Sequence, residues 1–511
     1  MTDMTDRPPT RFSRPGHGWQ QVGQQLMSAA STVAGRAPRA PLPVGAPDEV
    51  LAQVAAELGP QDLPAAGIGE QAALNRMAQI VHEYGLNLTH ELCAAHLQPP
   101  PLSVAVAADA LASATNASLD TYDSGPATLA IEEWTVQALA RLAGLPATSG
   151  GVFGPGGSYS NLLAMLIARD QAGAKRGIDI RHDGVVALGD PVVLCSRVAH
   201  FSVQRACAAL GLGESAVVTV DCDDEHRMVP SALSAVLDSL EEAGRTPIAV
   251  VATAGTTDFG TVDPLPLIAD IAYERGLWLH VDAAYGFGAL FSDRFAGLLS
   301  GIDRADSITL DLHKVGWQPA AASLLLLADT ESFSSLDRSV AYLNPEDDLE
   351  AGFGGQLGLT LQTTRRPDVL KVATTLMAYG RNGLGEMLES CHELALHAQS
   401  RVASEPQFEL VSEATLTTVV FRYLCDELDI DQVNAEVRRR LISSGTALIG
   451  RTQVRIAADG EPRTCLKLTL LNPETTADDI ERLFDEIVRV ALEVESEGLA
   501  PAALNVGVAH D

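Results

Sequence analysis

Lysine is rare in this chain, and one lysine stands where it could react. The sequence has four lysines: Lys175, Lys314, Lys371 and Lys467. Arginine stays protonated near neutral pH and cannot form an imine, so amine chemistry has only these four candidates. Lys314 directly follows the strand-like run Ser307–His313, where its stem can pack but its ammonium must find a partner or lose a proton. This position favours an imine-forming lysine over a lysine that merely reaches into solvent.

Two further side chains stand at the ends of apolar runs. Asp282 follows Leu277–Val281, and small residues come next. At the C-terminal edge of a parallel sheet this carboxylate could bind a metal, a ribose or a protonated ring nitrogen, or could simply be solvated. His200, beyond the run Val192–Cys195, could stack on a flat ring or move protons, or could pack as an ordinary histidine.

A glycine-rich segment leads into a helical pattern. Gly150–Asn161 contains Gly156, Gly157 and Ser158 and precedes the apolar spacing of Leu162–Arg169. A helix N-terminus with free backbone N–H groups and nearby hydroxyls suits a phosphate, although glycine-rich turns without such a role are common. The segment lacks the GxxxxGK[ST] pattern, which argues against nucleotide hydrolysis.

A phosphate cradle, an acid for a pyridinium nitrogen and an imine-forming lysine are together the requirements of pyridoxal 5'-phosphate (PLP). The three features together indicate PLP more specifically than any one of them alone. A dinucleotide-dependent oxidoreductase could use the glycine segment, but this class leaves Lys314 and its spacing from Asp282 unexplained. A catalytically inactive scaffold would be expected to have lost one of these two residues.

The elements that position these side chains alternate along the sequence. Short apolar, β-branched runs are separated by amphipathic segments such as Ser231–Ala243 and Leu265–Arg275. This order predicts an α/β fold with a mainly parallel sheet covered by helices on both faces. Between Asp282 and Lys314 the chain fits a single crossover with a helix at 293–299, so both side chains should reach the same sheet edge on neighbouring strands.

Composition and periodicity divide the chain into five parts. We expect a flexible arm at 1–45, a helical segment at 46–117, a large cofactor-binding α/β domain at 118–375, a small α+β domain at 376–496 and a loose tail at 497–511.

The composition excludes several classes of partner. The net charge of −31 argues against nucleic acid and anionic membranes, and no apolar run is long enough to span a bilayer. The seven cysteines are scattered without a CxxC pair, which indicates neither a disulfide framework nor a zinc site. Because no signal-peptide pattern opens the chain and the cysteines are dispersed, we expect a cytoplasmic protein. We also expect no bound metal.

These segments resemble the group II PLP-dependent amino-acid decarboxylases over roughly residues 45–490. The resemblance rests on Gly156–Asn161, Thr253–Thr257, His280–Gly286 and Asp311–Lys314. It implies PLP-dependent transferase fold type I, with a seven-stranded type of sheet, and a carboxy-lyase that converts an L-amino acid to its amine and carbon dioxide. It also implies a homodimer with shared active sites, in which residues 46–117 take part in dimerisation.

The resemblance also implies roles for individual residues. Lys314 would hold the cofactor as an imine, Asp282 would pair with its pyridine nitrogen, and His200 would stack on its ring. The residues implied to hold the phosphate or line the ring are Gly157, Ser158, His313, Thr253 and Ala284. Tyr342, on a mobile loop that reaches the partner subunit's site, would donate a proton to the carbanion carbon; a tyrosine that only packs at the interface is the alternative.

The substrate stays open at this point. Leu361–Arg366 and Ala341–Pro345 are similar to the bacterial L-2,4-diaminobutyrate and lysine branch, which favours 2,4-diaminobutyrate, lysine or ornithine. One departure from the family falls near the phosphate, at Gly154-Pro155. The others fall on substrate and loop positions of the branch: His90–Cys93, Ser339 and Pro367. The alternatives are a glutamate- or aromatic-type decarboxylase and a decarboxylating aldehyde synthase.

Overall fold

The computed structural model describes residues 11–13, 15–34, 36, 40–338, 340–455 and 460–498. Ser339, most of the expected tail at 497–511 and parts of the expected arm at 1–45 lie outside these residues. The chain divides into two compact units, Met1–Gln98 with Cys391–Asp511, and Pro99–Ser390. These two units are defined by compactness and do not correspond one to one to the five parts predicted from the sequence. The five-part division therefore stays a prediction.

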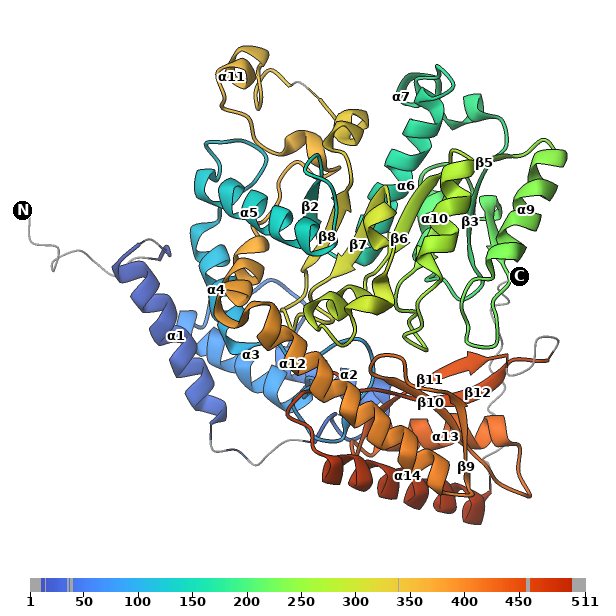
Figure 1. Ribbon diagram of the computed structural model, residues 1–511. Helices are drawn as coiled ribbons and strands as arrows, with labels where there is room; N and C mark the ends of the chain where they lie inside the picture. The colour runs from blue at the N-terminus through green and yellow to red at the C-terminus, as the bar shows by residue number, and fades with distance from the viewer. Residues whose placement is uncertain are drawn as a thin grey trace, which may run out of the picture. The chain divides into compact units, whose positions relative to one another are not determined.

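The Pro99–Ser390 unit is built on a seven-stranded sheet (Figure 1). In spatial order its strands are β2 (Gly150–Gly154), β8 (Ser323–Leu327), β7 (Ser307–Asp311), β6 (Trp278–Asp282), β5 (Thr246–Thr253), β3 (Pro191–Ser196) and β4 (Val217–Val220). The pairs from β7 to β4 are all parallel, and β8 is antiparallel to both of its neighbours. The predicted mainly parallel α/β sheet is confirmed.

Helices accompany this sheet in alternation with the strands (Figure 1). They are α4 (Ser103–Thr115), α5 (Pro126–Leu142), α6 (Gly157–Ala174), α7 (Ile180–Asp183), α8 (Ser202–Ala209), α9 (Pro230–Glu242), α10 (Leu265–Glu274) and α11 (Glu346–Glu350). Every residue of β3, β6, β7 and β8 is buried, as expected for strands covered on both faces. The long helix α12 (Val369–Ser404) begins in this unit and ends in the other, with a non-helical residue at Gly380.

Two segments differ from the sequence-based expectation. The glycine-rich segment begins with a buried strand, β2, and only Pro155 and Gly156 separate that strand from α6. The crossover from β6 to β7 contains three short 3-10 turns, at Gly286–Phe291, Ala296–Leu299 and Ile302–Arg304, rather than the helix expected at 293–299. Seven residues that include Gly297 make a weak α-helix, because glycine costs about 1 kcal/mol in a helix interior.

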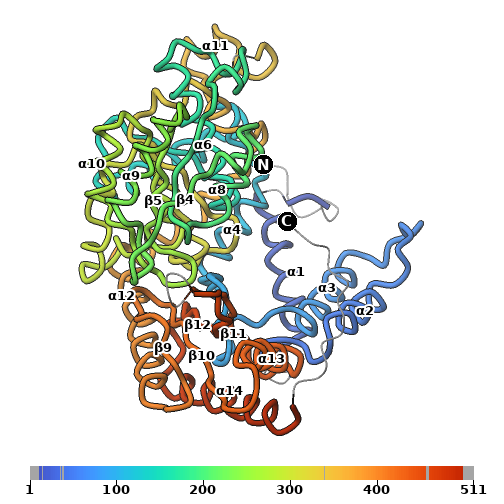
Figure 2. Tube along the Cα trace, turned by 90° about the vertical axis from the view of Figure 1, so that its right-hand side faces the viewer, coloured from blue at the N-terminus to red at the C-terminus, as the bar shows by residue number. Residues whose placement is uncertain are grey.

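The other unit joins the two ends of the chain (Figure 2). Its five-stranded sheet runs in the order β1 (Cys93–Ala94), β11 (Leu448–Val454), β12 (Arg463–Thr469), β10 (Thr418–Tyr423) and β9 (Phe408–Ser412). Its helices are α1 (His17–Val33), α2 (Pro47–Leu58), α3 (Glu70–Tyr84), α13 (Ile430–Ser443) and α14 (Ala477–Glu497). One apolar core is shared by the second half of α12, by α13, by α14 and by the strands. Helix α1 lies within the segment 1–45, for which a flexible arm was expected. Its amphipathic pattern was overlooked because the residues on both sides are rich in proline and glycine, which have low helix propensity.

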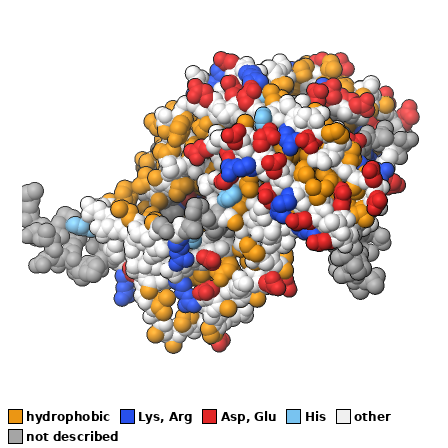
Figure 3. Space-filling model, turned by 90° about the horizontal axis from the view of Figure 1, so that it is seen from below, with side chains coloured by type: hydrophobic (Ala, Val, Ile, Leu, Met, Phe, Trp, Pro, Cys, Tyr) orange, Lys and Arg blue, Asp and Glu red, His pale blue; other side chains and the backbone are white. Residues whose placement is uncertain are grey.

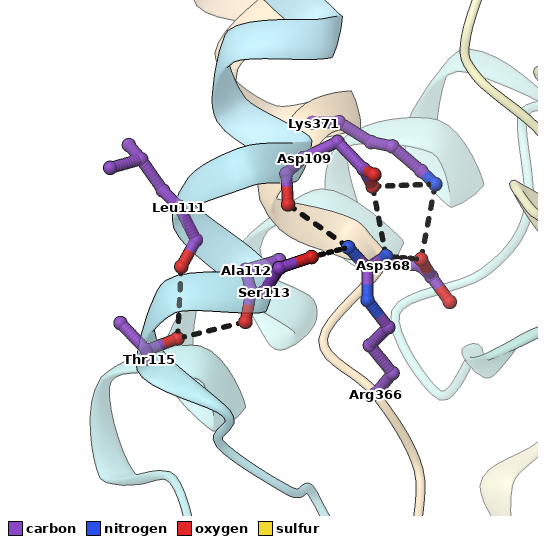
Figure 4. Close-up of polar contacts among 8 residues, drawn as sticks. All are labelled: Asp109, Leu111, Ala112, Ser113, Thr115, Arg366, Asp368 and Lys371. Carbon is purple, nitrogen blue, oxygen red and sulfur yellow. Dashed lines mark hydrogen bonds and ion pairs between the residues drawn. The ribbon is translucent and has the colours of Figure 1, made fainter. Parts of the chain in front are cut away.

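A cluster of charges ties α4 to the start of α12 (Figure 4). The ammonium of Lys371, a fully buried side chain, lies 3.0 Å from a carboxylate oxygen of Asp109 and 3.0 Å from one of Asp368. Arg366 also pairs with both aspartates and donates to the hydroxyl of Ser113. The positive charges of Lys371 and Arg366 thus balance the negative charges of the two aspartates. This balance explains why Lys371 can be buried without a catalytic role.

The surface carries the acidic excess in a dispersed form. On the face shown in Figure 3, aspartate and glutamate side chains are interspersed with arginines and lysines. In the described part of the chain, no helix combines the length and the apolar character that a membrane span requires.

Candidate active site

Three strand ends and one helix start meet at one edge of the seven-stranded sheet. Thr253, at the end of β5, is paired with Asp282, at the end of β6, and Asp282 is paired with Thr309 of β7. Asp311 ends β7, and Lys314 follows it by three residues. The register therefore places the predicted acid and the predicted lysine at the same edge, as the crossover argument required.

A cavity of about 250 Å³ opens at this edge. It is lined by Gly156, Gly157, Ser158, Asn161, His200, Thr253, Gly255, Thr257, Asp282, Ala284, Tyr285, Asp311, His313 and Lys314. Eight of the nine predicted site residues are in this set: Gly157, Ser158, His200, Thr253, Asp282, Ala284, His313 and Lys314. The structure brings them together, while the role of each one stays a prediction.

Lys314 is held by an acidic neighbour. Its Nζ lies 3.0 Å from Oδ2 of Asp311, a carboxylate whose side chain is only 3% exposed. The same oxygen lies 3.6 Å from Nε2 of His313. Burial lowers the pKa of His313, so its ring is neutral near neutral pH. The ammonium of Lys314, beyond the end of a buried strand, is thus paired with the carboxylate of Asp311.

Asp282 is fixed through both of its carboxylate oxygens. The backbone N–H of Ala284 donates to Oδ1 at 3.1 Å, and the side-chain amide of Asn161 donates to Oδ2 at 2.8 Å. A buried carboxylate with several N–H donors keeps its negative charge at moderate cost. This charge is what a protonated ring nitrogen needs as a partner.

His200 lies across the cavity on the segment between β3 and α8. Its Nδ1 lies 2.8 Å from the hydroxyl of Ser202. Burial lowers its pKa, with Asp282 acting in the opposite direction. A neutral, partly buried imidazole beside a carboxylate suits contact with an aromatic ring.

The start of α6 is closely packed, and its first backbone N–H groups are left uncapped by the described side chains. A Cβ added at Gly157 would stand 2.8 Å from Oδ2 of Asp311 and 3.3 Å from Cβ of Ala284, so only glycine fits without displacing neighbours. No side chain of the described residues caps the N-terminus of this 18-residue helix. Its first N–H groups and the positive end of its dipole are therefore available to a ligand.

The residues present fit PLP. Three buried polar atoms of the cavity lining have no hydrogen-bond partner within the described structure: Oγ1 of Thr253, Oδ1 of Asp311 and Nδ1 of His313. Buried polar atoms are almost always paired, so these three point to a polar ligand. Gly157, Ser158 and the start of α6 suit its phosphate, Asp282 its ring nitrogen and Lys314 its aldehyde carbon.

Tyr342 is the predicted residue that the structure places elsewhere. Its side chain is 81% exposed and lines a second cavity, of about 280 Å³, together with Arg169, Arg181 and Gln362. A local turn holds its segment, since Asn344 accepts from the N–H of Val340. Within one protomer Tyr342 does not line the cavity at Lys314, and its predicted role would need a partner subunit.

The structure adds two residues to the predicted set. Asn161 contacts Asp282, and Asp311 contacts Lys314. The sequence offered one signal for Asn161: it stands four residues after Gly157 and therefore on the same face of α6. For Asp311 the signal was its place three residues before Lys314 at the end of a strand.

The chain is similar to known proteins over most of its length. The family model described as the pyridoxal-dependent decarboxylase conserved domain matches residues 56–424. An L-2,4-diaminobutyrate decarboxylase of Rhizobium meliloti is 40% identical over 441 residues, 86% of each chain. A protein of the same name from Acinetobacter baumannii is 34% identical over 437 residues, 83% of this chain and 84% of the relative.

A solved structure matches the fold over nearly the whole chain. It is the glutamate decarboxylase domain of diaminobutyrate-pyruvate transaminase and L-2,4-diaminobutyrate decarboxylase from Vibrio parahaemolyticus, with a TM-score of 0.84 and 32% identity. The match covers 94% of this chain and 98% of the other. By its sequence, its fold and the residues gathered at Lys314, the chain belongs to the group II family of pyridoxal 5'-phosphate-dependent amino-acid decarboxylases.

Proposed function

We propose that this decarboxylase acts on a diamino acid, with L-2,4-diaminobutyrate as the first choice and lysine and ornithine as the next. The observation that carries the proposal is the name shared by the two relatives at 40% and 34% identity, each matched over more than four-fifths of its length. The glutamate- or aromatic-type decarboxylase and the decarboxylating aldehyde synthase remain the alternatives within the family.

Each residue of the cavity would have a separate task. Bound PLP supplies an electron sink for the bond that breaks when carbon dioxide leaves. Lys314 would anchor the cofactor, and Asp282 would keep a proton on its ring nitrogen, which its two N–H donors support. His200 would cover the ring, and Gly157, Ser158 and His313 would bind the phosphate.

The proton that replaces the carboxylate would come from Tyr342 of the partner subunit in a homodimer. The exposure of this side chain and its absence from the cavity lining support an arrangement in which one chain completes the site of the other. The scattered cysteines without a CxxC pair support the proposed cytoplasmic location.

A panel of amino acids tests the substrate. The purified chain, supplied with PLP, is given diaminobutyrate, lysine, ornithine, glutamate, tyrosine and tryptophan, and carbon dioxide, amine and aldehyde are measured. We expect amine from diaminobutyrate with the highest kcat/KM and no activity from Lys314→Ala. A preference for glutamate or an aromatic amino acid, or aldehyde as the main product, would replace the proposal by the corresponding alternative.

A further inference from the structure

A buried amide connects the two sides of the cavity. The Nδ2 of Asn161, at the start of the second turn of α6, lies 2.8 Å from Oδ2 of Asp282 and 2.8 Å from the hydroxyl of Ser202. Its Oδ1 lies 3.0 Å from Nε2 of His280. All four side chains are buried, so water does not compete for these contacts.

The direction of each hydrogen bond follows from the carboxylate. An ionised Asp282 can only accept, so the atom of Asn161 that faces it must be the NH₂ group. The other end of Asn161 is then the carbonyl oxygen Oδ1, which can only accept. Nε2 of His280 must therefore carry a proton and donate it to this oxygen. The orientation of the amide and the tautomer of the histidine are thus determined together.

Two more side chains continue this chain away from the cavity. Nδ1 of His280, left without a proton, accepts from the hydroxyl of Ser307 at 2.8 Å. That oxygen in turn accepts from the indole N–H of Trp278 at 2.8 Å. Burial also lowers the pKa of His280 to about 4, which keeps its ring neutral as the chain requires.

The second branch runs to His200. The hydroxyl of Ser202 accepts from Asn161, and its own proton is then free for Nδ1 of His200 at 2.8 Å. The backbone N–H of Ser202 points to the same nitrogen at 3.3 Å. With Nδ1 accepting, a neutral His200 carries its proton on Nε2.

We propose that Asn161 is a positioning residue that couples the carboxylate of Asp282 to the tautomer of His200, and that His280 holds Asn161 in the orientation this requires. The inference rests on the proposed roles of Asp282 and His200 at the cofactor. A buried asparagine that only satisfies its own hydrogen bonds is the competing explanation. The two explanations differ because only coupling makes the tautomer of His200 respond to a substitution at Asn161.

The first test substitutes Asn161→Leu, which keeps the approximate volume and removes both polar ends. The control is Asn434→Leu, since Asn434 is also fully buried with three hydrogen bonds but belongs to the unit formed by the chain ends. We expect Asn161→Leu to raise the Kd for PLP about tenfold or more, as for the loss of a hydrogen bond to a charged group. Asn434→Leu should leave this Kd within about twofold of the parent value.

The second test reads the tautomer directly. In the chain labelled with ¹⁵N-histidine, His200 should show a protonated Nε2 and a bare Nδ1, and its signals are assigned by their loss in His200→Gln. Ser202→Ala, a small change that the fold should tolerate, should shift the His200 signals, and Asn161→Leu should shift them as well because the amide acts through Ser202. His200 signals that do not respond to Ser202→Ala would overturn the coupling.

The third test asks whether His280 acts through Asn161. His280→Phe should weaken PLP binding when Asn161 is present and add little in the Asn161→Leu background, whereas His392→Phe serves as the buried control. Additive effects of His280→Phe and Asn161→Leu would overturn the proposal. If the parent chain fails to bind PLP at Lys314, the proposed function itself is wrong; normal binding with unresponsive variants is evidence against the positioning role alone.

Discussion

At the scale of single residues, the site depends on charges that are compensated before any ligand arrives. Lys314 pairs with Asp311, Asp282 receives two N–H donors, and burial lowers the pKa of His280 and of His313. The sequence predicted Lys314 and Asp282 because a charged residue at the end of an apolar run stands out. Asn161 was not predicted as a contact, because its partners come from two other segments and no local pattern records their distances.

The identity of the cofactor lysine is the first prediction. Sodium borohydride should fix PLP irreversibly to the chain, and peptide mapping should find the added mass on the peptide that contains Lys314. Lys314→Ala should carry no fixed cofactor, whereas Lys175→Ala, which changes an exposed lysine, should be labelled like the parent. Added mass on Lys371 or Lys467 would contradict the assignment.

The second prediction concerns pH and His280. Burial lowers the pKa of His280 from 6.5 to about 4. Between these two pH values the side chain is protonated in the unfolded chain and neutral in the folded chain. Its contribution to stability is therefore present above pH 6.5 and is lost as the pH falls toward 4. In His280→Gln this titration is absent, so the stability advantage of the parent should shrink by up to about 3 kcal/mol across that range.

Urea unfolding of both chains at a series of pH values measures this difference. Because all other titrating groups are common to the two chains, their contributions cancel in the comparison. A constant difference between parent and variant from pH 7 to pH 4 would mean that His280 does not resist protonation.

At the scale of elements, most strands of the seven-stranded sheet, including the edge strand β4, were predictable, whereas β2 and β1 were not. Strands β3, β5 and β8 are nearly continuous apolar runs, because both of their faces are covered. Strand β2 is rich in glycine, so its sequence indicates a turn. Strand β1 has only two residues and shows no periodicity at all.

The charge cluster between α4 and α12 gives the third prediction. Lys371→Met keeps the length of a buried side chain but leaves Asp109 and Asp368 with Arg366 as their only cation in this cluster (Figure 4). We expect the free energy of unfolding to fall by about 3 kcal/mol, the usual effect of removing one partner of a buried ion pair. Thermal or urea unfolding measures the loss, and Lys175→Met should change it by less than about 0.5 kcal/mol. An unchanged stability of Lys371→Met would show that the cluster contributes nothing net.

At the scale of the whole molecule, the proposed sharing of each site between two chains concerns Tyr342. Eight of the predicted residues line one cavity of the single protomer, and Tyr342 is not among them. A sequence can show that a tyrosine belongs to a loop, but the chain to which that loop reaches is set by a quaternary arrangement that no local pattern encodes.

Mixed dimers test the proposed sharing. Tyr342→Phe alone should lose amine and, with oxygen as the oxidant, release aldehyde, ammonia and hydrogen peroxide. A purified heterodimer of Tyr342→Phe with Lys314→Ala has one site that combines an intact lysine with an intact tyrosine from the other chain, and should regain about half of the parent amine formation. If Tyr342 acts within its own chain, the heterodimer regains none.

The pairing of β1 with β11 also constrains the order of events during synthesis. Cys93 is made early, but its partner Leu448 leaves the ribosome only after the entire Pro99–Ser390 unit. That intervening unit can fold while the chain is still growing, as domains generally do, whereas the unit made of the two ends has to wait for the last strands. A ribosome stalled beyond residue 390 should therefore display a nascent chain whose seven-stranded sheet resists protease, while β1 and the first three helices remain open to cleavage and to chaperones.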